Sequence, residues 1–311
     1  MTRAARTAIT SGLAAAALIA ATACATALPA LAQEAALAQE AALAQEAAPA
    51  PKPAAARAPG VTVAKWTEGL SGPQGIAFDG KSVYIAENGS GRVLRFNADG
   101  SGKRVHAEGL LGPAYALLQG GALYVAERKG NTVARVDAEG KVTRLGGDAV
   151  IDPLGLAPAA DGGLLALSHR ESVVYRFGAN NGPRAEQPFA RPDGGTKYGW
   201  RDLAAGPDGA LYVTDEVSNA ILVRRPGADA FAPFATGLSS PGGLVFGPDK
   251  TLYVTEEGTG RLSRVSADGK TVTVLAEGMG KARDAVFLNA RTLLVTDRDG
   301  GNVWKVTLPT L

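Results

Sequence analysis

Residues 241–265 read PGGLVFGPDKTLYVTEEGTGRLSRV, in which three short apolar runs are separated by turn residues. The turns are Gly-Pro-Asp-Lys at residues 247–250 and Gly-Thr-Gly at residues 258–260. Short apolar runs that alternate with Gly, Pro and Asp turns predict antiparallel strands joined by hairpins. A fourth run ends near Glu277-Gly278-Met279, so the stretch predicts a four-stranded β-meander.

The same pattern recurs throughout residues 60–311. Its clearest mark is a β-rich tetrad that ends on an acid in five of six copies, at residues 84–87, 124–127, 165–168, 212–215, 253–256 and 294–297. Consecutive tetrads begin 40, 41, 47, 41 and 41 residues apart, and each is followed by an alternating strand, at residues 92–96, 132–136, 173–177, 220–224, 261–265 and 302–306. Four strands in a repeat of about 40 residues are typical of a propeller blade. The sequence therefore predicts an all-β fold, a six-bladed β-propeller with four antiparallel strands in each blade.

The two ends of the repeat region fit together as one blade. The last copy stops at Leu311 after its third strand, whereas residues 61–70 read like a fourth strand with no blade before them. An unpaired strand at the end of the ring would leave an exposed sheet edge. We therefore expect the N-terminal strand to close the last blade.

The first 59 residues have a different character. Residues 1–32 combine two arginines, an apolar stretch and Ala30-Leu31-Ala32, which is typical of a secretory signal peptide cleaved after Ala32. This predicts a periplasmic or secreted protein; the competing interpretation is a lipoprotein anchored at Cys24, which follows an imperfect lipobox. A transmembrane segment is disfavoured because the apolar run is short. Residues 33–59 repeat QEAALA and then become rich in Ala and Pro, which indicates a low-complexity tether.

The composition excludes several classes of function. The chain has 32 basic and 30 acidic residues, and the predicted signal peptide contains Arg3 and Arg6, so the mature protein is neutral overall. Without a run of Lys and Arg, there is no electrostatic footprint for nucleic acid. The single cysteine, Cys24, excludes an intrachain disulfide framework and a cysteine-based zinc cluster.

A repeated protein provides its own control, because a residue type that occurs in every blade serves the scaffold. The acid that ends the tetrad occurs in five of six blades, as Glu87, Glu127, Asp215, Glu256 and Asp297. We interpret these acids as structural groups that accept turn N–H donors. The alternative is a ring of carboxylates that binds a cation.

Departures from the repeat are the candidates for function. In each blade the position after the proline, or its equivalent, opens the innermost strand and is held by Gln74, Ala114, Leu154, Arg201, Gly242 and Arg283. The next position is held by Gly75, Tyr115, Gly155, Asp202, Gly243 and Asp284. Blades four and six therefore carry Arg-Asp where the others carry other residues. Two interpretations stay open: Arg201 and Arg283 form a cationic patch that binds a carboxylate or phosphate, or each pairs with its neighbouring aspartate and closes the channel.

The longest spacing, between blades three and four, enlarges the loop that leads into the fourth blade. This loop contains Lys197, Tyr198 and Trp200 and is a candidate pocket wall, although propeller loops also carry inert insertions. His169 follows the only tetrad without an acid and is the histidine expected near the channel face, as a catalytic group or as a hydrogen-bonded surface residue. His106 falls on an outer strand and is set aside.

The repeat resembles the six-bladed propellers of the NHL-repeat and senescence-marker-protein/gluconolactonase superfamily. The pattern that carries the resemblance is Pro-x-Gly-Leu, Pro-Asp-x-x-Leu-Tyr-Val-Thr-Glu and Arg-Leu-x-Arg-Val, as in residues 241–265. The resemblance to gluconolactonases implies a divalent metal held by Glu, Asn and Asp in the channel, but this chain offers Gln74, Leu154 or Arg201, and Gly242 there. Streptogramin-lyase relatives need histidines and glutamates that two histidines cannot reproduce.

We therefore expect an exported, monomeric propeller, without metal or cofactor, that binds a small ligand, anionic in one form of the hypothesis, or a protein partner. The alternative is a gluconolactonase-like hydrolase, a lactonase or esterase, that acts in the channel with a divalent cation. The sequence does not decide whether the protein is an enzyme and assigns no catalytic residue. The candidate ligand-binding residues are Gln74, Tyr115, His169, Trp200, Arg201, Asp202, Arg283 and Asp284.

Overall fold

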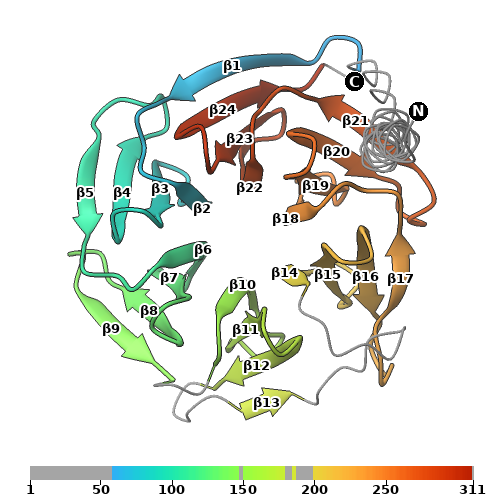
Figure 1. The fold of residues 1–311 in the computed structure, drawn as a ribbon, viewed down its shortest axis with the longest axis horizontal. Helices are drawn as coiled ribbons and strands as arrows, with labels where there is room; N and C mark the ends of the chain where they lie inside the picture. Colours follow the sequence, from blue (N-terminus) through green and yellow to red (C-terminus); the bar gives the residue numbers. More distant parts are fainter. Residues whose placement is uncertain (1–57, 147–149, 179–183, 187–198, 310–311) are drawn as a thin grey trace, which may run out of the picture. The chain divides into compact units, whose positions relative to one another are not determined.

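Six four-stranded antiparallel sheets stand around a common centre (Figure 1). The computed structural model describes residues 58–146, 150–178, 184–186 and 199–309. The predicted signal peptide, almost all of the predicted tether, Cys24, and Lys197 and Tyr198 of the enlarged loop lie outside the described residues. The described residues contain no helix, and hence none that is long and apolar enough to cross a membrane.

The strands follow the predicted order from the centre of the ring outward. The innermost strands are β2 (Pro73–Phe78), β6 (Pro113–Gln119), β10 (Pro153–Pro158), β14 (Trp200–Ala205), β18 (Pro241–Phe246) and β22 (Ala282–Asn289). The second strands contain the tetrads and are β3 (Ser82–Glu87), β7 (Ala122–Glu127), β11 (Leu164–Ser168), β15 (Leu211–Asp215), β19 (Leu252–Glu256) and β23 (Thr292–Asp297).

The outer half of each blade holds the remaining strands. The third strands are β4 (Arg92–Asn97), β8 (Thr132–Val136), β12 (Val173–Phe177), β16 (Ala220–Arg224), β20 (Arg261–Val265) and β24 (Asn302–Thr307). The outermost strands are β5 (Arg104–Ala107), β9 (Val142–Leu145), β13 (Arg184–Glu186), β17 (Ala232–Ala235), β21 (Val272–Ala276) and β1 (Thr62–Thr67). The prediction of an all-β, six-bladed propeller with four strands in each blade is confirmed.

The N-terminal strand closes the last blade, as predicted. β1 pairs antiparallel with β24, with Thr62 opposite Thr307 and Val63 opposite Val306. Figure 1 shows β1 along the outer side of β24, far in sequence from the rest of that sheet. The pairing removes the exposed edge that β24 would otherwise present.

Every innermost strand carries a bulge at its first residues. In β14 the register with β15 shifts between Trp200 and Leu203, and the other five innermost strands shift at the equivalent positions. A bulge leaves residues unpaired with the neighbouring strand and re-aims their side chains. The two re-aimed positions are those that the sequence analysis compared between blades, such as Arg201 and Asp202.

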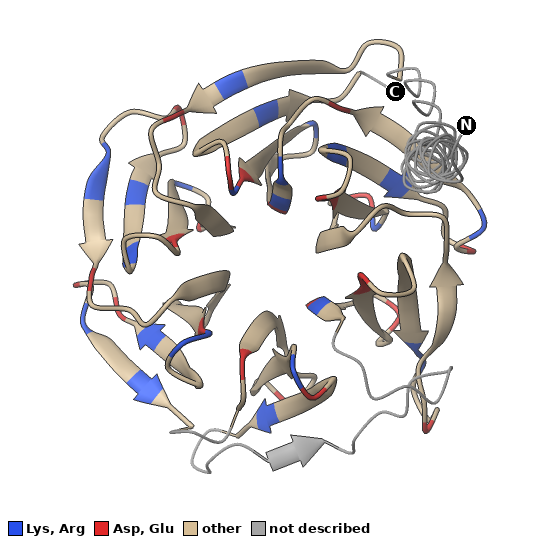
Figure 2. Cartoon of the chain, viewed as in Figure 1, with Lys and Arg blue, Asp and Glu red and all other residues tan. Residues whose placement is uncertain are grey.

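Apolar clusters between neighbouring blades hold the innermost strands in place. One cluster joins Leu167 of the third blade to Leu203 and Leu222 of the fourth. Aromatic pairs add edge-on contacts between blades, such as Tyr253 with Phe287 at 5.0 Å between ring centroids. Figure 2 shows that the channel ends of β14 and β22 carry basic residues, with acidic residues on nearby turns.

Candidate functional site

The third residue of the innermost strands alternates around the ring between glycine and a large polar side chain. Blades one, three and five have glycine there, whereas blades two, four and six have Tyr115, Asp202 and Asp284. A Cβ atom at Gly155 would lie 2.7 Å from Asp202 Cα, and one at Gly243 would lie 2.7 Å from Asp284 Oδ1. Close approach of the next blade therefore requires glycine at these two positions. The small residues make room for the large ones of the next blade.

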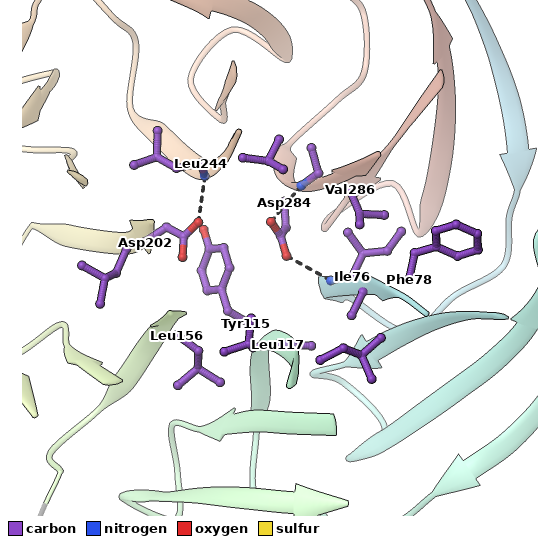
Figure 3. Close-up of a pocket in the computed structure, with 15 residues that line it drawn as sticks. Ile76, Phe78, Tyr115, Leu117, Leu156, Asp202, Leu244, Asp284 and Val286 are labelled. Carbon is purple, nitrogen blue, oxygen red and sulfur yellow. Dashed lines mark hydrogen bonds between the residues drawn. The ribbon is translucent and has the colours of Figure 1, made fainter. Parts of the chain in front are cut away.

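Asp202 and Asp284, the aspartate pair, are held by backbone donors from two blades. Asp202 Oδ2 accepts the Leu244 N–H at 2.7 Å, and Asp284 Oδ2 accepts the Ile76 N–H at 3.0 Å. Leu244 and Ile76 both belong to the blade that follows (Figure 3). Asp284 Oδ1 also accepts the N–H of Ala285 at 2.8 Å. No arginine, lysine or histidine among the described residues forms an ion pair with either carboxyl group.

Burial makes the aspartate pair unusually hard to ionise. Removal from water raises the pKa of Asp284 to about 7, because burial disfavours the charged form more than the backbone donors favour it. Burial and the nearby charge of Asp284 raise the pKa of Asp202 well above its usual range. The pair therefore retains a proton at neutral pH.

The aspartate pair faces a cavity of about 240 Å³ at the centre of the ring. The walls are mostly apolar and include Phe78, Leu156 and Val286, and Tyr115 lines the cavity beside the two carboxyl groups (Figure 3). The Tyr115 hydroxyl donates to the carbonyl oxygen of Arg283 at 3.3 Å. None of the residues that line the cavity is basic.

The arginines that precede the two aspartates do not bond to them. Arg201 donates to Glu216 and, through Nη1, to Glu257 Oε2 at 2.5 Å. Arg283 Nη1 donates to the same Glu257 oxygen at 2.9 Å, and Arg298 Nη2 lies 2.8 Å from Glu257 Oε1. We call these five residues the arginine cluster. Its carboxylates come from the turns after β15 and β19, so the interpretation in which each arginine pairs with its neighbouring aspartate, one of the two left open, is wrong.

Two buried atoms near the arginine cluster lack a hydrogen-bond partner in the described part of the chain. Arg283 is only 1% exposed, yet its Nε atom has no acceptor. Gln74, 5% exposed, has no donor for Oε1. The Arg283 guanidinium lies over the Tyr115 ring, 5.2 Å from its centroid. A buried polar atom without a partner costs about 1–3 kcal/mol, so water or a ligand atom at either point is favoured.

Of one ring of channel residues the sequence analysis named only His169, although its own criterion would have found the other five. The residue directly after each tetrad varies between blades and is of four types: Asn88, Arg128, His169, Glu216, Glu257 and Arg298. Each donates its backbone N–H to the carbonyl that precedes the innermost strand of its own blade, for example Glu257 to Ser240 at 3.0 Å. The shared backbone hydrogen bond thus places four kinds of polar side chain at six equivalent points of the ring.

The tetrad acids themselves serve the scaffold, as predicted. Glu87 accepts the N–H of Ser71 at 2.9 Å, and Glu127 accepts that of Leu111 at 2.8 Å. Glu256 accepts the equivalent N–H of Ser239, and Asp297 accepts the N–H of Lys281, one residue closer to the innermost strand. In the third blade serine replaces the acid, and the Ser168 hydroxyl donates to the carbonyl oxygen of Ile151, two residues before the innermost strand. Each of these groups fastens the second strand to the entry of its blade.

His169 and Trp200 belong to one contact, but only the histidine lies among the channel residues. His169 Nδ1 lies 2.7 Å from the carbonyl oxygen of Trp200, and Nε2 lies 3.7 Å from Glu216 Oε1. The Trp200 ring is fully buried against Phe231, with ring centroids 4.9 Å apart. The structure therefore places the indole in the apolar core between blades.

The residues present do not fit the divalent metal that the gluconolactonase resemblance implies. At the three equivalent positions, Gln74 has a neutral side chain, Leu154 is apolar and Gly242 has no side chain. No group of three or more His, Cys, Asp or Glu in the described ranges is arranged to hold a metal ion. A hard cation needs six to eight oxygen ligands, which this set does not supply.

Comparisons with known proteins agree with this architecture. Residues 60–306 match the model of the virginiamycin B lyase family. No curated protein sequence matches the chain.

Among solved structures, virginiamycin B lyase from Staphylococcus aureus is 16% identical with a TM-score of 0.59, over 80% of this chain and 99% of that chain. Its catalytically inactive histidine-to-alanine variant, solved with quinupristin, gives the same values. A gluconolactonase from Xanthomonas campestris is 19% identical with a TM-score of 0.67, over 82% of this chain and 92% of that chain. At these identities the likeness shows a shared fold, and the predicted resemblance to gluconolactonase-like propellers is confirmed.

Proposed function

Because the chain belongs to the virginiamycin B lyase family, we propose that it is a ligand-binding propeller with its small-molecule site in the central cavity. The observation that supports this most strongly is the convergence of Tyr115, Asp202 and Asp284 on that cavity. An apolar cavity with a few convergent polar groups of shifted pKa is the usual form of a small-molecule site. The volume of about 240 Å³ favours a ligand smaller than a typical drug.

The direct test is a thermal-shift screen with matched compounds. The panel contains small amines, the corresponding alcohols and carboxylic acids, sugar acids and a lactone. A compound that binds the cavity raises the melting temperature of the wild type and loses this effect when Leu156→Trp fills the cavity. Asp268→Asn, in an exposed turn after β20, is the matched control and should respond like the wild type. If no compound shifts the wild type, the small-molecule proposal fails and a protein partner is the remaining form of the binding hypothesis.

The anionic form of the hypothesis uses the arginine cluster instead of the cavity. Three guanidinium groups share Glu257, and the Nε atom of Arg283 has no hydrogen-bond partner among the residues that the structure describes. A ligand carboxylate would supply the missing acceptor. In the same screen, this form predicts stabilisation by acids that is lost in Arg283→Gln and kept in Asp284→Asn.

A second candidate function is catalysis, with His169 as a general base. His169 lies among the channel residues, and the contact of its Nδ1 atom with the Trp200 carbonyl oxygen at 2.7 Å orients the imidazole ring. Glu216, 3.7 Å from Nε2, would stabilise the imidazolium that forms after proton abstraction. The contact between His169 and Glu216 favours a lyase over the metal-dependent hydrolase that the sequence analysis gave as the alternative function.

The catalytic candidate is tested by incubating purified protein with virginiamycin B and following its loss by chromatography. Turnover by the wild type should be abolished in His169→Ala and kept in His106→Ala, whose histidine lies on the outermost strand β5. Absence of turnover, or equal turnover in His169→Ala, would remove this candidate.

We also propose that the mature protein is exported and monomeric. The proposal rests on the sequence of residues 1–32, which lie outside the described part. Mass spectrometry of the purified protein should give an N-terminus at Gln33 and the mass of one chain under native conditions. A lipid-modified Cys24 would instead establish the lipoprotein alternative.

A further inference from the structure

The central cavity has acidic groups on its surface and no basic group. Asp202 is 4% exposed and Asp284 is 6% exposed, and both line the cavity with Tyr115. All other residues of the lining are aliphatic or aromatic. A buried carboxylate is normally paired with a cation, because hydrogen bonds alone do not replace its hydration. The cavity therefore lacks the counter-charge that would stabilise its ionised form.

The nearest arginines do not supply this counter-charge. Arg283 donates to Glu257 and packs on the Tyr115 ring, and Arg201 donates to Glu216 and Glu257. Neither arginine lines the cavity. Both guanidinium groups thus donate to glutamates of the arginine cluster, and the aspartate pair accepts hydrogen bonds from backbone N–H groups.

A primary ammonium group matches the acceptors that remain. It carries three N–H donors, and the cavity presents two carboxyl groups and the Tyr115 hydroxyl, whose own proton is directed to the Arg283 carbonyl. A divalent metal would need more oxygen ligands than these. Walls such as Ile76, Leu117 and Leu244 are suited to a hydrocarbon body attached to the ammonium group.

We propose that the central cavity binds a small primary amine in its ammonium form, with the charged group between Asp202 and Asp284 and the apolar body against the cavity walls. This inference rests on the proposed small-molecule site and specifies its ligand class. The Tyr115 hydroxyl oxygen accepts a hydrogen bond from the ammonium group, and the Tyr115 ring, which packs against Arg283, forms one wall of the site.

Proton release accompanies this binding. The aspartate pair holds a proton near pH 7, and an ammonium ion favours the ionised pair, so the affinity rises with pH by up to about tenfold per unit while one proton is displaced. Tyr115 on β6 lies beside the pair, and the other charged groups that interact with Tyr115 are Arg201 on β14, Arg283 on β22 and Glu257 after β19.

The test compares phenylethylamine with 2-phenylethanol and phenylacetate by calorimetry on the wild-type protein. The amine should bind, the alcohol and the acid should bind at least about tenfold more weakly, and the amine affinity should increase from pH 6 to pH 8. Asp202→Asn and Asp284→Asn, which keep the side-chain shape, should each weaken the amine about tenfold to hundredfold. Asp268→Asn should bind like the wild type.

The outcomes separate this inference from the proposed function. If the alcohol or the acid binds as tightly as the amine, or if amine affinity does not change with pH, the ammonium inference is overturned and the cavity remains a ligand site. If none of the three compounds binds and the wider screen is also negative, both proposals fail. The wild-type comparison needs no variant, so poor folding of a variant does not prevent a decision.

Discussion

The arginine cluster and the aspartate pair contain adjacent residues of the same two strands. The arginines form ion pairs, whereas the aspartates have no ion-pair partner in the described part of the chain. On β14 and β22, Arg201 and Arg283 reach carboxylates of neighbouring turns, whereas Asp202 and Asp284 reach only backbone N–H groups. The bulge at each strand entry allows this divergence, because it re-aims consecutive side chains. In the cluster three arginines pair with two glutamates, and Arg298 also pairs with Asp299 outside it, whereas the aspartate pair has backbone donors alone.

The largest effect should come from removing the carboxylate that the cluster shares. Glu257→Gln leaves the buried Arg283 without its counter-charge and should reduce the free energy of unfolding by about 3–5 kcal/mol. Chemical denaturation measures this, with Glu68→Gln at an exposed ion pair of β1 as the control that should stay near wild type. If Glu257→Gln reduces the free energy of unfolding only slightly, the arginine cluster does not stabilise the fold as described.

The aspartate pair should lower the free energy of unfolding as the pH rises, whereas the shared carboxylate of the cluster raises it. The pKa of Asp284 is raised to about 7 in the folded state, so the folded state binds more protons than the unfolded state between about pH 4 and pH 7. Stability due to this group is therefore complete at low pH and is lost as the pH rises, by on the order of 1.4 kcal/mol per unit. Asp284→Asn should make this decline shallower, because only the pKa of Asp202, which burial also raises, still contributes to it. Parallel pH profiles for wild type and Asp284→Asn would contradict the assignment.

The smallest effect is expected at the exposed side of the cluster. Arg298 is about one-third exposed and pairs with Asp299 as well as with Glu257, which keeps its other two arginines. Arg298→Gln should therefore reduce the free energy of unfolding by about 1 kcal/mol or less. A loss as large as that of Glu257→Gln would show that all three arginines act as one unit.

The fold was almost fully accessible from the sequence, because each blade repeats the same strands and turns. Four of the third strands, such as β8 and β20, have the predicted bounds, and the closing strand pairs as expected. Repetition also singled out Tyr115, Asp202 and Asp284 against glycine in the other blades, and the structure places all three at one cavity.

The partners of these residues were not accessible in the same way. The direction of Arg201 relative to Asp202 depends on a bulge whose geometry the pattern of residue types does not record. Glu216 and Glu257 could have been found by extending the comparison between blades one residue beyond the tetrad. The burial of Trp200 against Phe231 depends on packing between elements, to which its position in the loop gave no clue.

The central claim is that the buried aspartate pair holds a proton near neutral pH because no arginine of the cluster neutralises the charge of its carboxylates. A carbon-13 NMR titration of aspartate carboxyl groups in the intact protein tests this most directly. We predict one carboxyl group that titrates near pH 7, is absent in Asp284→Asn, and moves to a lower pKa when phenylethylamine is bound. If every aspartate in the wild type titrates within the ordinary range around pH 4, the pair is not as described and the account is contradicted.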